Sequence, residues 1–372
     1  MTPKIFSFFS GAGFLDLGFE QAGFETIFAN EIHPEFMKTY NFARQKLSIK
    51  EPKLGCFVNS IESFFTDKEI REQFNKIFQK ATHKKQPIGF IGGPPCPDFS
   101  VAGKNKGREG NNGRLSGLYT KLICQYKPDF FIFENVKGLW RTKRHREYYE
   151  ELKQEFMAND YLLIDNLINA LEYGVPQDRD RIILFGILKT KTNTQNLSEY
   201  FNWKKFQIYS KEQINSINFP KTTSFNEQSI LKMPNEILSD ITIEYWFQQN
   251  DVTNHPNANH FFKPREGLSK FLIVEEGDCS KKSYKRPHRW RYSPTASYGN
   301  NEVHLHPYRA RRMSISETLA IQSLPREYQM PKDISLSNMF KMVGNGVPYL
   351  AALGIGKTVK DFLENHYETH ML

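Results

Sequence analysis

KIFSFFSGAGFLDLGFEQAG, which spans residues 4–23, gives the strongest indication of the fold. Its first part is apolar, a glycine turn from Gly11 to Gly13 follows, and a helical pattern comes next. A strand that passes through glycines into a helix places backbone N–H groups and the positive end of the helix dipole at one point. Glu31 ends the next apolar run, about 18 residues after Gly13, where an acidic side chain typically holds ribose hydroxyls. We therefore expect an adenosine-containing cofactor here, and the spacing differs from the G-x-G-x-x-G of NAD enzymes.

Further apolar runs follow the first one, KIFSFF at 4–9, and helical stretches separate them. They are ETIFANE (25–31), IGFIGG (88–93), DFFIFENV (129–136) and RIILFGIL (181–188). Uninterrupted apolar runs are typical of strands that are buried on both faces, as in parallel sheets. The sequence thus predicts an α/β fold with a doubly wound, mostly parallel sheet.

The pattern changes after residue 188, which suggests three regions. Residues 1–188 form the predicted catalytic, cofactor-binding domain. Residues 189–305 form a smaller domain, whose core at about 189–285 is rich in Asn, Gln, Ser, Thr and Lys. Residues 306–372 supply C-terminal helices. One is predicted to begin at Ser314, which forms an S-x-x-E capping box with Glu317. The last begins near Pro348 and returns to the catalytic domain.

One of the four cysteines stands out by its neighbours. Cys96 lies in GGPPCPDFS (92–100), directly after the predicted strand 88–93 and thus at the edge of the sheet where α/β enzymes do their chemistry. A core thiol would lie inside an apolar run rather than between prolines. We interpret Cys96 as a nucleophile. No cysteine pair has the C-x-x-C spacing of a metal site, so no metal is predicted.

Charged residues follow two other strands in the same way. Glu134 lies in FENV (133–136), where a carboxylate can lie beside the cysteine. Arg179 and Arg181, in QDRDR (177–181), point the same way on an extended segment and could hold a base edge or a phosphate. Each of these residues alone could equally belong to a surface ion pair.

The order of these motifs resembles that of the DNA (cytosine-5) methyltransferase family. The similar segments span almost the whole chain and are FSGAGFLDLGFEQAGF (9–24), GGPPCPDFS (92–100), ENV (134–136), QDRDRIILFG (177–186), RRMSISETLAIQSLP (311–325) and GNGVP (344–348). The resemblance implies a methyltransferase fold, S-adenosyl-L-methionine as methyl donor and double-stranded DNA clamped between two domains. It implies that residues 189–285 read the target sequence.

The resemblance also assigns site residues. Cys96 falls on the nucleophile, Glu134 on the acid and Arg181 on the residue that holds the target base, with Arg179 beside it. The expected cofactor-binding residues are Phe9, Ser10, Gly11, Ala12, Gly13, Glu31, Ile32, Asn59, Ser60, Pro94 and Asn345. The mechanism implied is addition of the thiolate to C6 of a flipped-out cytosine, which makes C5 nucleophilic.

Four positions depart from the family pattern. Phe14 stands where a second glycine is common, which is expected to narrow the cofactor turn, and Ile32 replaces an aromatic residue that stacks on adenine. Pro97 replaces a glutamine that lies close to the DNA. The contact to the adenine amino group falls on Asn59 or Ser60, and the sequence does not choose between them.

The charge of the chain favours a nucleic-acid partner. The net charge is +9, and basic residues cluster at 104–108, 137–146 and 281–291, in two cases with Trp or Tyr among them. The residues expected to bind DNA are Ser100, Lys104, Arg108, Arg286 and Arg289. Without a membrane-length apolar run or a signal peptide, we expect a cytoplasmic monomer, with a restriction endonuclease as its functional rather than bound partner.

Three other readings compete. An RNA (tRNA) cytosine-5 methyltransferase shares these motifs but carries a Cys-Phe-Thr element in its recognition region. Cys279, in GDCSKK, is the only cysteine within 189–285, so that element is missing. A catalytically silent DNA-binding relative is disfavoured because Cys96, Glu134 and Arg181 are all present. An NAD oxidoreductase is more distant still.

Overall fold

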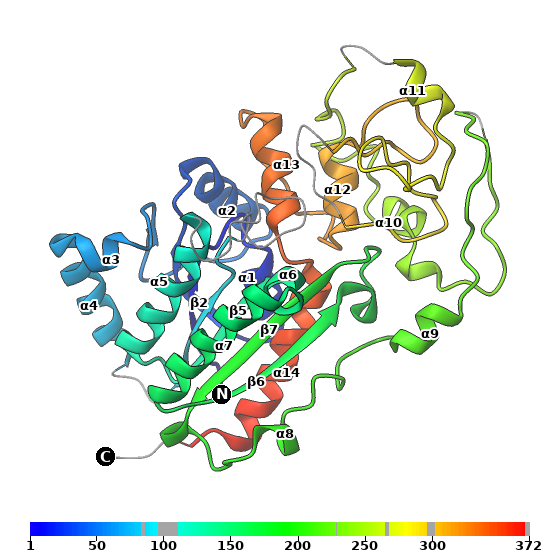
Figure 1. Cartoon of the computed structure of the whole chain (residues 1–372). Helices are drawn as coiled ribbons and strands as arrows, with labels where there is room; N and C mark the ends of the chain where they lie inside the picture. Colours follow the sequence, from blue (N-terminus) through cyan, green and yellow to red (C-terminus); the bar gives the residue numbers. More distant parts are fainter. Residues whose placement is uncertain (83–85, 96–110, 228, 265–267, 296–301, 369–372) are drawn as a thin grey trace.

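The computed structural model describes residues 1–82, 86–95, 111–227, 229–264, 268–295 and 302–368. Figure 1 shows a large lobe built around a sheet and a smaller lobe that contains α10 (Ile243–Gln249) and α11 (Leu268–Ile273). Among the described residues, no helix combines the length and the apolar character of a membrane span.

Seven strands of the described chain form one mixed sheet in the order β3-β2-β1-β4-β5-β7-β6. Neighbouring strands are parallel, except that β7 runs antiparallel to both β5 and β6. The strands are β1 (Lys4–Phe8), β2 (Glu25–Asn30), β3 (Cys56–Phe57), β4 (Ile88–Gly92), β5 (Phe130–Val136), β6 (Tyr161–Asn169) and β7 (Asp180–Leu188). The predicted mostly parallel α/β fold is confirmed.

The five apolar runs of the sequence all became strands, because their side chains are buried on both faces of the sheet. Every residue of β1 and β4 is buried. The strand β6, YLLIDNLIN, was not predicted, and most of it is only half-buried at the sheet edge. An edge strand lacks the continuous burial that makes central strands recognisable.

Helices cover both faces of the sheet, as a doubly wound fold requires. On one face, Phe74 of α4, Tyr119 of α5 and Phe156 of α7 share a core with the sheet; on the other, Phe19 of α1 and Ile355 of α14 do so (Figure 1). The helices of this lobe are α1 (Phe14–Gln21), α2 (Pro34–Lys46), α3 (Ser63–Thr66), α4 (Lys68–Thr82), α5 (Asn111–Tyr126), α6 (Lys137–Arg141), α7 (Lys143–Ala158) and α14 (Tyr349–His366), with the 3-10 turns Ala170–Tyr173 and Lys189–Lys191.

The smaller lobe has little regular structure. Its helices are short, and Figure 1 shows α12 beside them and α13 between the lobes. The elements of the chain between β7 and α14 are α8 (Leu197–Tyr200), which packs on the larger lobe, and α9 (Lys211–Ser216), α10 (Ile243–Gln249), α11 (Leu268–Ile273), α12 (Ile315–Ile321) and α13 (Leu336–Asn345), with the 3-10 turn Ser239–Ile241. The predicted capping box is present, since the Ser314 hydroxyl accepts from the Glu317 N–H and the Glu317 carboxylate from the Ser314 N–H.

The packing of the side chains places the boundaries between the lobes at other residues than those predicted. Leu197, Phe201 and Trp203 lie in the core that β5, β7 and α14 share, so the chain just after residue 188 belongs to the larger lobe. Residues of α12 contribute to two cores: Ile321 packs with Phe247 of α10, whereas other α12 side chains pack with α13. The smaller lobe therefore begins later than residue 189 and includes part of the segment after 305.

Candidate active site

Three adjacent strands bring the predicted site residues to one edge of the sheet. In the parallel register Phe8 of β1 pairs with Gly92 of β4, and Gly92 pairs with Phe133 of β5. The residues that follow, namely Phe9, Gly93 and Glu134, therefore emerge together. The carboxyl edge of an α/β sheet is the usual place for a ligand site.

The glycine turn after β1 closes on Glu31. Gly11 and Gly13 have φ values of 56° and 84°, in the left-handed region that favours glycine. The backbone N–H of Gly11 donates to the Glu31 carboxylate at 2.9 Å, and the N–H of His33 donates to its other oxygen at 2.9 Å. Glu31 is buried, so the acidic residue predicted from spacing lies directly against the turn.

The surroundings of this turn fit an adenosine-containing cofactor. The buried hydroxyl of Ser10 has no hydrogen-bond partner among the described residues, and such a group is costly unless a ligand pairs with it. Ile32 and Val58 are 54% and 47% exposed. They follow the paired ends of β2 and β3, where apolar side chains can contact a base. Sequence reasoning missed Val58, although an apolar residue directly after a short strand was a usable signal.

Asn59 and Ser60, the two alternatives for the adenine contact, are both engaged within the chain. The Asn30 side-chain amide donates to the carbonyl of Asn59 at 2.9 Å and to its Oδ1 at 3.3 Å. The Ser60 hydroxyl accepts from the backbone N–H of Glu62 at 3.2 Å. The contacts do not favour either residue.

Phe14 does not narrow the turn as expected. Its side chain is buried against the C-terminal segment, where its ring meets that of Tyr328 edge-on at 5.3 Å between centroids. A Cβ on Gly346 would lie 2.1 Å from this ring, so the GNG turn needs glycine at this position. The bulk of Phe14 is thus taken up by packing on residues 328 and 346. Asn345, the remaining predicted residue of this turn, is exposed at the end of α13.

Glu134 and Arg181 form the charged centre of the site. Arg181 Nε lies 2.8 Å from Glu134 Oε1, and both side chains are largely buried. Burial raises the pKa of Glu134, while the charges of Arg181 and Arg179 oppose the rise. A Cβ on Gly93 would lie 2.3 Å from Glu134 Oε2, so the carboxylate packs directly on the glycine that precedes Pro94.

Asn135 connects the FENV strand to the proline turn. Its side chain is buried and donates to the carbonyl of Pro94 at 3.4 Å. Sequence reasoning used Asn135 only as part of a motif and missed this contact. Cys96 follows almost at once, but it lies outside the described residues, as do three residues expected to bind DNA: Ser100, Lys104 and Arg108.

Arg179 contacts a turn that the sequence analysis did not connect with it. It is buried, and its Nη2 donates to the carbonyls of Gly344 and Gly346 at 2.8 and 3.1 Å. Its guanidinium therefore holds the GNG turn, while its charge acts on Glu134 from a distance. These contacts give Arg179 a positioning role at the GNG turn in addition to its predicted place beside Arg181.

Arg286 and Arg289 are wrong as phosphate contacts, because both are buried in the smaller lobe. Arg286 donates to the carbonyls of Val274, Phe271 and His306 and stacks on the Phe225 ring at 3.7 Å. Arg289 makes a two-pronged ion pair with buried Glu276, with both N···O distances 2.8 Å. A guanidinium satisfied in this way is part of the core and cannot reach DNA.

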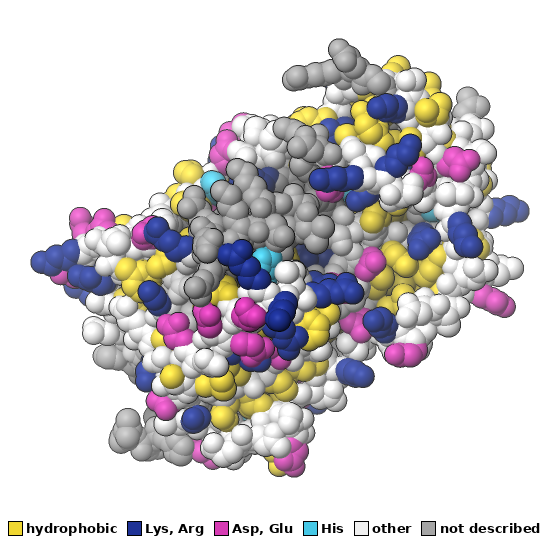
Figure 2. Space-filling model, viewed as in Figure 1, with side chains coloured by type: hydrophobic (Ala, Val, Ile, Leu, Met, Phe, Trp, Pro, Cys, Tyr) yellow, Lys and Arg dark blue, Asp and Glu magenta, His cyan; other side chains and the backbone are white. Residues whose placement is uncertain are grey.

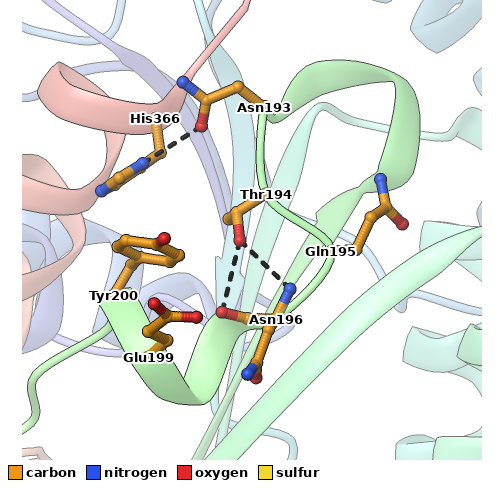
Figure 3. A pocket seen from close by; sticks show the side chains of 7 residues that line it. All are labelled: Asn193, Thr194, Gln195, Asn196, Glu199, Tyr200 and His366. Atoms are coloured by element: carbon orange, nitrogen blue, oxygen red, sulfur yellow. Dashed lines mark hydrogen bonds between the residues drawn. The ribbon is translucent and has the colours of Figure 1, made fainter.

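A separate polar pocket lies far from these residues. It has a volume of about 480 Å³, and Figure 3 shows His366 and Asn193 in contact there, with 3.1 Å between His366 Nδ1 and Asn193 Oδ1. The pocket is lined by Asn193, Thr194, Gln195, Asn196, Glu199, Tyr200 and His366. All of them except His366, the last residue of α14, follow the end of β7, which pairs with the start of β5. The pocket therefore lies at the opposite edge of the sheet, and it contains no predicted site residue.

Known proteins resemble the chain over nearly its whole length. The family model described as C-5 cytosine-specific DNA methylase matches residues 3–361. A type II methyltransferase of Neisseria meningitidis serogroup C, M.NmeDI, is 51% identical over 98% of this chain and 85% of its own. A type II methyltransferase of Fusobacterium nucleatum, M.FnuDI, is 29% identical over 97% of this chain and 95% of its own.

Solved structures agree on the fold. A methyltransferase of Entamoeba histolytica superposes with a TM-score of 0.56 at 14% identity, over 98% of this chain and 99% of its own. A prophage-encoded protein of E. coli superposes with a TM-score of 0.66 at 20% identity, over 98% of this chain and 100% of its own.

Proposed function

The chain belongs to the C-5 cytosine-specific DNA methylase family, and on this premise we propose how its own residues carry out the reaction. The protein is a DNA (cytosine-5-)-methyltransferase. The family and the fold are those of enzymes that use S-adenosylmethionine, and the substrate is double-stranded DNA.

The cofactor lies, in this proposal, between the glycine turn and the ends of β2 and β3. Glu31 and the turn backbone hold its ribose, the Ser10 hydroxyl gains a partner, and Ile32 and Val58 contact adenine. S-adenosylmethionine, when bound, supplies the methyl group. The unpartnered Ser10 hydroxyl beside the turn supports this placement.

Cys96, Glu134 and Arg181 activate the cytosine. The Cys96 thiolate adds to C6. The π electrons of the C5=C6 bond shift to C4–C5 and those of the C4=N3 bond shift to N3, which takes a proton or a hydrogen bond from Glu134. C5 thereby becomes enamine-like and open to methylation. Loss of the C5 proton to water and expulsion of the thiolate then restore the ring, and the N3 proton returns to Glu134. The target base must leave the duplex stack for this chemistry.

The Glu134–Arg181 pair is the observation that carries this mechanism. Burial raises the pKa of Glu134, which favours the protonated carboxyl that N3 needs. Arg181, 2.8 Å from Glu134, can also stabilise negative charge on the O2 side of the base. The three described cysteines are poorer candidates for the nucleophile, because burial raises the pKa of Cys56, Cys124 and Cys279 to about 11, 12 and 11.

We propose that exposed basic residues of the large lobe, which follow Glu134 in the chain, contact the DNA. Arg141, Lys143, Arg144 and Arg146 are exposed at α6 and the start of α7. Figure 2 shows Lys and Arg side chains on both lobes of this face. Basic side chains beside the catalytic edge suit phosphates that flank the target base. They replace Arg286 and Arg289 in this role.

The smaller lobe, in our proposal, chooses the DNA sequence, and the larger one does the chemistry. Both relatives named above are called type II methyltransferases, so we propose the modification role of a restriction-modification system, with a restriction endonuclease as functional partner. Because cellular DNA is the substrate, we also propose a cytoplasmic enzyme, acting as a monomer. Replacing the smaller lobe with that of a relative of different specificity should transfer the target sequence.

The Cys96→Ala variant tests whether Cys96 is the nucleophile. Cells that express the wild type should show methylated cytosine within one DNA sequence by bisulfite sequencing, and cells that express Cys96→Ala should show none. Cys124→Ala and Cys279→Ala serve as matched controls and should retain methylation. Methylation of tRNA but not DNA would favour the RNA reading, and methylation by neither would favour the catalytically silent one. Turnover by Cys96→Ala above a few per cent would place the nucleophile elsewhere.

A further inference from the structure

The glycine turn is held from the C-terminal side by one tyrosine. The hydroxyl of Tyr328 donates to the carbonyl of Ala12 at 2.8 Å, and both residues are buried. The same ring packs against Phe14, the first residue of α1. Tyr328 therefore contacts the turn on its carbonyl side, whereas Glu31 binds it through the N–H of Gly11.

The segment that carries Tyr328 is itself fixed by the smaller lobe. The Asn250 side chain donates to the carbonyl of Leu324 at 2.8 Å, and Asn257 both donates to the carbonyl of Met330 and accepts from its N–H, each at 3.0 Å. Buried amides paired in this way with main chain fix the position of the whole segment.

His255 makes the most direct contact of this kind. Its Nε2 lies 3.0 Å from the carbonyl of Tyr328, and its Nδ1 accepts from the N–H of Asn257 at 3.1 Å. These partners require the neutral ring with the hydrogen on Nε2. Burial lowers the pKa of His255, which keeps the ring neutral. A continuous set of buried hydrogen bonds thus runs from the smaller lobe through Tyr328 to Ala12.

We propose that Tyr328 is a positioning residue for the cofactor, and that through it the smaller lobe sets the conformation of the glycine turn. The inference rests on the proposed cofactor placement. Tyr328 touches the turn and not the reacting atoms, so it acts on cofactor affinity rather than on the chemical step. Since His255 contacts the carbonyl of Tyr328 and the Tyr328 hydroxyl contacts Ala12, a substitution at His255 is expected to alter cofactor affinity through Tyr328.

Tyr328→Phe removes only the hydroxyl and tests this role. Titration of S-adenosylmethionine into the full chain should show about a tenfold rise in Kd, as expected for loss of one buried hydrogen bond that orients the turn. Turnover at saturating cofactor should stay within about twofold of wild type. Tyr161→Phe is the matched control. Its hydroxyl is equally buried and donates to the Pro128 carbonyl at 2.7 Å, in a part of the sheet remote from the turn.

His255 variants test the route from the smaller lobe. His255→Leu, which has no donor, should weaken cofactor binding, whereas His255→Gln offers an amide donor and should restore most of the affinity. The combined Tyr328→Phe and His255→Leu chain should lose less than the product of the two single effects. Unchanged Kd in Tyr328→Phe, with only the stability loss seen in Tyr161→Phe, would overturn the role. A wild-type chain that bound no S-adenosylmethionine would instead refute the proposed function itself.

Discussion

Gly93→Ala should inactivate the enzyme without unfolding it. A Cβ at this position would lie 2.3 Å from Glu134 Oε2, whereas ordinary contacts begin at about 3.4 Å, so the carboxylate must retreat by about 1 Å. Gly93 does not have a positive φ, so alanine fits its backbone. The substitution therefore displaces Glu134 while leaving its chemistry intact.

A displacement of about 1 Å in a catalytic group lowers turnover by about 100-fold, which corresponds to about 2.7 kcal/mol in the activation barrier. We expect kcat to fall by this factor, with the Kd of S-adenosylmethionine and the urea midpoint close to wild type. Single-turnover methylation of a target duplex measures the chemical step directly.

Two further variants make this test specific. Gly117→Ala is the control, because it makes the same change in α5, where the new Cβ approaches only the Tyr148 hydroxyl. Glu134→Asp shortens the side chain by one methylene, so its cost should be smaller in the Gly93→Ala chain than in wild type. If Gly93→Ala kept more than about a third of the wild-type kcat, Glu134 would not need its present position.

Other substitutions probe the cofactor turn, the core and the DNA surface. Burial raises the pKa of Asp16 from 3.8 to about 6, so the stability that its protonated carboxyl contributes is lost as pH rises from about 4 through 6. Urea unfolding of Asp16→Asn should lack this dependence, which is worth about 2 kcal/mol between pH 4 and 7. Calorimetry should show that Glu31→Ala weakens S-adenosylmethionine binding by about 1–3 kcal/mol. Arg286→Met should lower the unfolding free energy by about 2–4 kcal/mol, yet leave the salt dependence of DNA affinity unchanged. Neutralising Arg141 and Lys143 together should instead reduce that salt slope by about 2.

Local sequence was sufficient for the elements whose signal is continuous along the chain. Residues 4–23 combine an apolar run, two glycines and a helix, and each part forms for reasons within a few residues of itself. The ends of the strands could also be located from the sequence. Because parallel strands align their carboxyl ends, this predicted Glu31 and Glu134 at the carboxyl edge of the sheet, where the structure has them. The Ser314 capping box is equally local.

Burial of charged residues could not be read from the sequence, because it depends on which distant segments supply partners. Arg141 and Arg286 both lie in basic clusters, yet Arg141 is exposed while Arg286 is enclosed by carbonyls of residues 271, 274 and 306. Nothing in the residues around position 286 distinguishes a phosphate ligand from a core cation. Only the folded chain brings those carbonyls to the guanidinium.

Dependence on distant partners also distinguishes the groups that position the site from the groups that do its chemistry. Glu134 and the glycine turn could be identified as site candidates from the sequence by itself, because each follows a recognisable strand. Tertiary structure alone decided that Arg179 holds the GNG turn, 165 residues away along the chain, and that Tyr328 reaches Ala12 across 316. A hydrogen bond over such a separation leaves no periodicity or spacing in the sequence, because its geometry exists only once both lobes have packed.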